Sequence, residues 1–395
     1  MYSDHVKQLF ERPDADTDSA DKVLTLSGGG TGAGCFSMGA VGYLVKHGLF
    51  DQYDTINAVS GSTMLVALLE PCYAFKYTSE PDWYNKYIRS VVYAVMKQRI
   101  MAKMLIKFMN PMNWFRTGTH VAGELFAPLF AAELKPYTKD METYTGKSFR
   151  SNYIDMDDWH LSYDNTDLYN PVTGDAVSFF WIKRIFRCCV PFTYINRKPT
   201  MDAVFVDNMA LASVLGELQF SEMLSVSTVT DYVQDPVPRP PVTSIWQFLK
   251  RLLNITEWTT APPNRNNIHM SVTMCKMLRR AGKSIQLAYP RQNSKWYSKP
   301  SIIMSKWYNG MLFLDEPIMR LIENMGYFEM HRTLTGRDDL PDSEHPNPDY
   351  PLSGDVAKAH FERYDSRSTL TYVAIEILEV GVRPLLQSLM FWKSS

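Results

Sequence analysis

Short apolar runs alternate with longer stretches of helical spacing along the first part of the chain. The run VLTLS, which follows Lys22, predicts a strand, GGGTGAG predicts a turn, and CFSMGAVGYLVKHG predicts a helix closed by Gly48. A second apolar run, TINAVS, leads into another apolar helical stretch, STMLVALLEPCYAF. Strands that alternate with helices are typical of a parallel sheet, so we expect an α/β fold.

The pattern becomes less regular toward the carboxyl end. Further strands are expected at AVSFFW, AVFV and MLSVSTV, and four prolines between residues 236 and 241 mark a linker or domain edge. We expect a loose lead-in over residues 1–22, a core over 22–235, and a helical or irregular extension over 236–395 that packs on the core. The extension carries no motif that points to chemistry.

A basic stretch interrupts this pattern between Trp83 and Gly123, where seven Lys and Arg residues occur without any Asp or Glu. Apolar residues, several of them Met, recur there at helical spacing and indicate an amphipathic helix. Residues 83–123 then form either a cap or membrane-facing segment that contacts anionic lipid, or a helix packed on the core with a solvated basic face.

Composition narrows the class of protein. The 395 residues are 45% hydrophobic and 21% charged with a formal net charge of −1, which indicates a globular chain with no overall attraction to nucleic acid. The five cysteines show neither zinc nor CxxC spacing, the amino terminus has no apolar signal segment, and charges interrupt the apolar stretch 372–392. We expect a cytoplasmic protein that is soluble or peripheral to a membrane, and we expect no metal ion or organic cofactor.

The first candidate for chemistry is Ser60, in the sequence AVSGS between an apolar strand and an apolar helix. A serine on a tight strand-to-helix turn needs small neighbours two positions away on either side, and Ala58 and Ser62 meet that need. The turn also brings the amide of Gly61 and the helix N-terminus toward the serine, where they can stabilise a negative charge. Small residues around a serine are common by chance, however, and the pentapeptide alone is a weak signal.

A glycine run strengthens the hypothesis. Gly28, Gly29 and Gly30 end the preceding strand, so in a parallel sheet they lie at the same edge as Ser60. Successive glycines expose backbone N–H groups that can form an oxyanion hole. A nucleotide-binding loop is the alternative, but the chain has no GxxxxGK[ST] lysine and no acidic residue at the end of the next strand.

The third candidate is Asp207, at the end of the short apolar run AVFV. A carboxylate at that place can accept the serine proton directly as general base. An Asp-Asn pair after a strand is otherwise a turn former, and Asp202 and Asp175 are rival carboxylates nearby.

In this order the motifs resemble those of the patatin-like phospholipases, and the Ser-Gly-Ser elbow is similar to that of the cytosolic phospholipase A2 group. The resemblance covers residues 22 to 232. It includes the glycine loop LSGGGTGAG, the elbow AVSGS, the segment TDLYNPVTGDAV, the turn FRCCVPF and the strand end VFVDN.

The resemblance implies a three-layer α/β/α fold with a mainly parallel sheet, and hydrolysis of a phospholipid or other acyl-lipid ester through an acyl-serine. It implies Ser60 as nucleophile, Asp207 as its base without histidine, and oxyanion donors around Gly29 and Gly30. The chain departs from the family pattern in three places, one of which is an extra residue between the glycine run and Gly39. Thr31 and Gly32 stand where a basic residue is usual, and Asp207-Asn208-Met209 replaces Asp-Gly-Gly or Asp-Gly-Ala.

Three other functions stay open from the sequence. An α/β-hydrolase esterase with a Ser-His-Asp triad would need a histidine after the acid, and His269, His331, His345 and His360 follow Asp207, none of them in a motif. A protein with this fold could bind lipid without catalysis. An acyltransferase would use the same acyl-serine with a lipid alcohol in place of water.

Overall fold

The computed structural model describes residues 21–74, 76–97, 147–157, 160–164, 193–195, 198–212, 214, 220–228, 262–291, 316–353, 355, 357, 359, 360, 378 and 382. The predictions for Asp175, for the segment around residues 165–190 and for most of the basic stretch concern residues outside these ranges.

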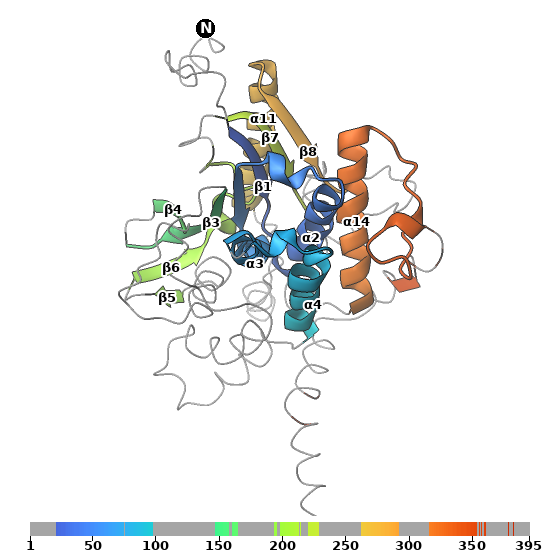
Figure 1. Cartoon of the computed structure of the whole chain (residues 1–395). Helices are drawn as coiled ribbons and strands as arrows, with labels where there is room; N and C mark the ends of the chain where they lie inside the picture. Colours follow the sequence, from blue (N-terminus) through green and yellow to red (C-terminus); the bar gives the residue numbers. More distant parts are fainter. Residues whose placement is uncertain are drawn as a thin grey trace, which may run out of the picture.

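The described residues form an eight-stranded sheet with strand order β5-β6-β3-β2-β1-β7-β8, to which β4 adds by pairing with β3 (Figure 1). Strands β3, β2, β1, β7 and β8 run parallel, whereas β4, β5 and β6 join by antiparallel pairing. The strands span Asp21–Leu26 (β1), Thr55–Val59 (β2), Ser148–Asp155 (β3), His160–Asp164 (β4), Thr193–Ile195 (β5), Lys198–Asp202 (β6), Phe220–Val226 (β7) and Ser284–Ala288 (β8).

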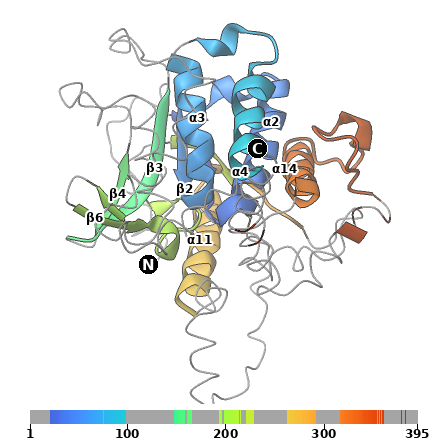
Figure 2. The same cartoon turned by 90° about the horizontal axis from the view of Figure 1, so that it is seen from below.

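Helices cover both faces of the sheet. Because strand side chains alternate between faces, Val23, Met223 and Ile285 share a cluster with Cys275 and Leu278 of helix α11 (Pro262–Arg280). Their neighbours along the strands pack in the main core with helices α2 (Gly30–Lys46), α3 (Thr63–Ala74) and α14 (Glu316–Thr335). Figure 2 shows α2, α3 and α14 apart from α11. The expected three-layer α/β arrangement with a mainly parallel sheet is therefore confirmed.

Residues beyond 236 contribute to this same core. Strand β8, which the sequence did not predict, pairs parallel with β7. Helix α14 packs along α2 at a close backbone contact, where a Cβ on Gly39 would lie 1.9 Å from the Glu323 carbonyl oxygen and one on Gly326 would lie 1.9 Å from that of Phe36. Glycine is required at both positions, since any side chain would force the two helices apart.

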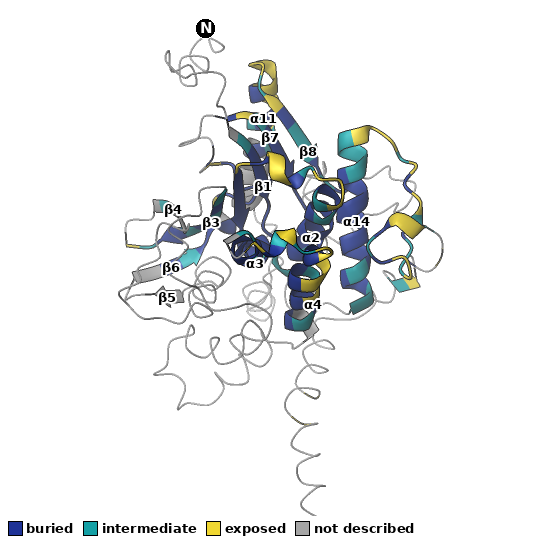
Figure 3. Cartoon of the chain, viewed as in Figure 1, coloured by how far each residue is buried: buried dark blue, intermediate teal, exposed yellow. Residues whose placement is uncertain are grey.

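The described beginning of the basic stretch is packed into the core. A π-helical turn, Tyr84–Arg89, continues into helix α4, Ser90–Lys97, and both bury apolar side chains (Figure 3). Lys86 pairs with Glu80, and Arg89 pairs with the buried Glu323. Arg89 therefore supports the fold through a buried partner, whereas Lys86 is exposed and pairs at the surface. No helix in the described part of the chain is long and apolar enough to cross a membrane.

Candidate active site

Ser60 follows β2 directly and has a positive φ of 53°. An L-residue other than glycine rarely adopts this conformation, and it persists only where the surrounding structure enforces it. Here α3 begins at Thr63, three residues after Ser60, so the chain must turn sharply between strand and helix. Such a strained serine between a strand and a helix is the geometry of a nucleophile elbow.

The Ser60 hydroxyl donates a hydrogen bond of 2.6 Å to Oδ2 of Asp202. Both residues are 2% exposed. The other carboxylate oxygen, Oδ1, accepts from the Val204 N–H at 2.9 Å. Burial raises the pKa of Asp202 to about 7, and the bonds from Ser60 and Val204 oppose this shift only in part. A carboxyl group with this pKa can both accept and release a proton near neutral pH.

The pairing of β3 explains why Asp202 meets Ser60. One edge of β3 pairs with β2 as far as Asn152, which lies opposite Val59. Beyond the end of β2, the same edge pairs with β6, and Tyr153 lies opposite Asp202. The residue after Val59 is Ser60, so consecutive positions of β3 bring the serine and the aspartate together.

Asp207, the carboxylate that the sequence predicted as the base, is bonded to other groups. Its two oxygens accept hydrogen bonds from the backbone N–H groups of Leu211 at 3.0 Å and Ala212 at 2.7 Å. The Ser60 hydroxyl has one proton, and it is directed to Asp202. One sequence signal favoured Asp202, because Ala203 keeps a small residue after the aspartate as the Asp-Gly pattern does, whereas Asn208 does not.

The glycine loop lies against the elbow. A Cβ on Gly28 would be 3.0 Å from the Ser60 Cβ, and one on Gly61 would be 1.8 Å from the Gly30 carbonyl oxygen. The positive φ angles of Gly29 (143°) and Gly30 (60°) turn the chain into α2. The glycine loop therefore lies at the same edge of the sheet as Ser60, as the sequence predicted.

The amide of Gly28 already has a hydrogen-bond acceptor within the protein. Its N–H donates to the Asn208 carbonyl oxygen at 2.8 Å. That bond ties the glycine loop to the segment after Asp207, which Asn57 also holds through a 2.8 Å bond to the Ala210 carbonyl oxygen. Gly28 therefore supports the loop, while Gly29, Gly30 and Gly61 stay candidates for oxyanion binding.

Two of the histidines proposed for a triad have partners elsewhere. Nδ1 of His331 lies 3.2 Å from the Tyr43 hydroxyl on the α2–α14 side of the sheet. His345 is buried against Tyr327 and Phe328, and burial lowers its pKa to about 4. Because the serine proton goes to a carboxylate, the geometry favours a dyad over a triad. Within the described residues, no three His, Cys, Asp or Glu side chains are grouped to hold a metal ion.

We compared the chain with protein-family models, curated proteins and solved structures. No protein-family model matches the chain, and no curated protein matches its sequence. Among solved structures, VipD from Legionella pneumophila has similarity at a TM-score of 0.31 and 10% sequence identity, covering 80% of this chain and 67% of VipD. A likeness at this level carries no argument about function.

Proposed function

We propose that this chain is a serine-dependent carboxylic ester hydrolase that acts on lipid acyl esters. The observation that carries the proposal is the 2.6 Å hydrogen bond from a conformationally strained serine to a buried carboxylate. In this assignment Ser60 is the nucleophile and Asp202 is its general base, in place of Asp207.

The reaction follows from this arrangement. Asp202 takes the hydroxyl proton as Ser60 Oγ attacks the ester carbonyl carbon, and the carbonyl oxygen becomes an oxyanion. The amides of Gly29, Gly30 and Gly61, together with the N-terminal dipole of α2, stabilise that charge. The leaving alcohol takes the proton from Asp202 as the tetrahedral intermediate collapses to the acyl-serine.

Water completes the cycle. Asp202 accepts a proton from the attacking water, a second tetrahedral intermediate forms, and the fatty acid leaves as Ser60 Oγ regains the proton. Each half-reaction needs Asp202 to gain and lose one proton, and a pKa of about 7 allows both steps at neutral pH.

The lipid substrate rests on the resemblance of the motifs to the patatin-like phospholipases. Peripheral membrane contact, cytoplasmic location and the role of the basic stretch belong to the same proposal. Bulk attraction to anionic lipid is small at a net charge of −1, so binding depends on the local cations of residues 97–116 and on apolar side chains.

Fluorophosphonate labelling and lipid-product analysis test the hydrolase. The wild-type protein should be labelled at Ser60 and should release free fatty acid from phospholipid vesicles. Ser60→Ala should show neither reaction, whereas Ser62→Ala should still be labelled. A folded wild-type protein without label at Ser60 would favour the non-catalytic lipid-binding protein, and transfer of the acyl group to an added lipid alcohol would favour the acyltransferase.

Vesicle sedimentation tests the membrane contact separately. Replacing Lys103 and Lys107 with Gln should weaken binding to anionic vesicles and leave cleavage of a soluble ester unchanged. Lys276→Gln with Arg280→Gln is the control, because it removes the same charge from exposed positions of α11. Equal vesicle binding by the two double variants would count against a membrane-facing basic stretch.

A further inference from the structure

Hydroxyl groups hold the two peptide carbonyls that precede the glycine turn, and they do so from opposite sides. Ser62 Oγ, in the elbow after β2, donates to the Ser27 carbonyl oxygen at 2.7 Å. Thr228 Oγ1, two residues beyond β7, donates to the Gly28 carbonyl oxygen at 3.1 Å. Strands β2 and β7 flank β1 in the sheet, so the glycine loop that follows β1 lies between these two hydroxyls.

The two bonds fix the directions of the next two amides. The described chain has no cis peptide bond, so each N–H points opposite to the carbonyl of its own peptide unit. The Ser27 carbonyl is held on the elbow side, and the Gly28 N–H accordingly points away from it and donates to Asn208. The Gly28 carbonyl is held on the Thr228 side, so the Gly29 N–H points toward the elbow that carries Ser60.

The Gly29 amide has the properties of an oxyanion donor. It has no hydrogen-bond acceptor among the described residues, although the amide just before it is paired. Its neighbour Gly28 lies close enough to Ser60 that a Cβ there would be 3.0 Å from the Ser60 Cβ. An unpaired N–H on the residue that follows this close contact is available for the charge that develops on the ester oxygen.

Thr228 is itself held in place. Its N–H donates to Ser27 Oγ at 2.9 Å, and the two side-chain oxygens are 3.4 Å apart. The residue is 3% exposed. This set of bonds joins the end of β7 to the end of β1, and rotation of the Thr228 hydroxyl would break both its bond to Gly28 and its contact with Ser27 Oγ.

We propose that Thr228 is a positioning residue for the oxyanion hole, because its hydroxyl fixes the Gly28–Gly29 peptide plane and thereby aims the Gly29 N–H at the reacting carbonyl. This inference rests on the proposed ester hydrolysis at Ser60. Thr228 acts through Gly29 and does not touch the substrate.

Enzyme kinetics provide the first test, with three variants of similar size. Thr228→Val keeps the shape and removes the hydroxyl, whereas Thr228→Ser keeps the hydroxyl. Thr25→Val is the matched control, since it removes a buried threonine hydroxyl that has no hydrogen-bond partner among the described residues. Thermal unfolding of each variant shows how much folded protein is present.

Thr228→Val should lower kcat by about 10- to 100-fold with KM changed less than about threefold, because the oxyanion exists only in the transition state and loss of one donor costs about 10²- to 10³-fold. Affinity for a trifluoromethyl ketone, which forms a tetrahedral adduct with the serine, should fall by a similar factor. Thr228→Ser should restore both values to within about threefold of wild type. Equal kcat values for Thr228→Val and Thr25→Val, per folded molecule, would overturn the proposal.

A spectroscopic test does not depend on activity. Consecutive glycines occur in this chain only at residues 28–30, so a protein labelled with ¹³C-carbonyl and ¹⁵N glycine shows one-bond carbonyl coupling only at the Gly29 and Gly30 amides. Thr228→Val should shift the Gly29 amide resonance, and Thr228→Ser and Thr25→Val should not. A shift in a protein without esterase activity would leave the peptide-plane role intact and reject the hydrolase, whereas an unshifted Gly29 resonance would reject the role of Thr228.

Discussion

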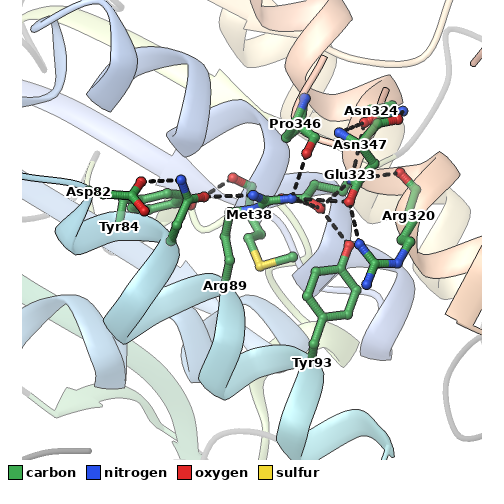
Figure 4. A network of polar contacts seen from close by, with 11 residues as sticks. Met38, Asp82, Tyr84, Arg89, Tyr93, Arg320, Glu323, Asn324, Pro346 and Asn347 are labelled. Atoms are coloured by element: carbon green, nitrogen blue, oxygen red, sulfur yellow. Dashed lines mark hydrogen bonds and ion pairs between the residues drawn. The ribbon is translucent and has the colours of Figure 1, made fainter. Parts of the chain in front are cut away.

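Asp202 and Glu323 are both buried carboxylates, but their partners differ in charge. Asp202 contacts the hydroxyl of Ser60 and the N–H of Val204, which are neutral groups. Glu323, which is 1% exposed, pairs with the Arg89 guanidinium and accepts further bonds from the Tyr93 hydroxyl and from Asn347 Nδ2 at 2.6 Å. Figure 4 shows Arg89 and Tyr93 directed at Glu323 from α4 and its preceding turn, with Asn347 on the other side.

This difference in partners distinguishes a carboxylate that is suited to proton transfer from one that stabilises the fold. A buried carboxylate without a cation is costly to ionise, so its pKa rises and it can accept a proton near neutral pH. A buried carboxylate that meets a guanidinium and two further donors is satisfied as an ion and holds its neighbours together. The network around Glu323 therefore joins α14 to α4 and its preceding turn, whereas the Ser60–Asp202 pair has the properties that the proposed reaction needs.

The largest effect is expected when the reactive carboxylate is neutralised. Asp202→Asn should lower kcat by about 10⁴-fold, of the order seen when the aspartate of a serine protease triad is replaced with asparagine. Asp207→Asn is the control and should lower kcat by less than about tenfold, because its carboxylate binds backbone N–H groups. Steady-state ester hydrolysis measures both, and a greater loss in Asp207→Asn would restore Asp207 as the base.

The next effect concerns stability. Glu323→Ala leaves the Arg89 guanidinium, whose side chain is 16% exposed, without its counter-ion and should lower the free energy of unfolding by about 3–5 kcal/mol. Glu316→Ala removes a more exposed partner of Arg320 and should cost less than about 1 kcal/mol. Urea unfolding compares the two, and equal losses would show that the buried network has no special role.

The pH dependence should follow Asp202. The base must be deprotonated, so kcat should fall about tenfold per pH unit below about pH 7 and level off above it. The folded state binds this proton more tightly than the unfolded chain, so its contribution to stability is lost as pH rises from the usual Asp range to about 7. Asp202→Asn should remove that decline in thermal stability, and a wild-type rate that is flat from pH 5 to 8 would contradict the assignment.

A smaller effect on stability is expected at the contact between α2 and α14. Gly39→Ala would place a Cβ against the Glu323 carbonyl oxygen and should destabilise the protein by about 1–3 kcal/mol through overpacking. Gly32→Ala, in the same helix but with nothing within 4 Å of its Cβ, should change stability by less than about 1 kcal/mol. Thermal unfolding distinguishes the two, and similar values would argue against a tight α2–α14 contact.

The sequence by itself determined the parts of the site that are local along the chain. A strand, a glycine turn and a helix predicted the loop at residues 28–30, and small residues on either side of Ser60 predicted its turn. Both follow from backbone sterics over a few residues, and parallel pairing placed them at one edge of the sheet.

Only the tertiary structure decided which carboxylate meets the serine and which glycine amides are free. Asp202 reaches Ser60 because β3 pairs with β2 and then with β6 along one edge, a register between segments about 140 residues apart that no local pattern encodes. The Gly28 N–H has an acceptor because the Asn208 carbonyl, far along the chain, lies next to it. Hydrogen bonds between distant segments depend on how the strands pair, and local residue patterns describe only the segments themselves.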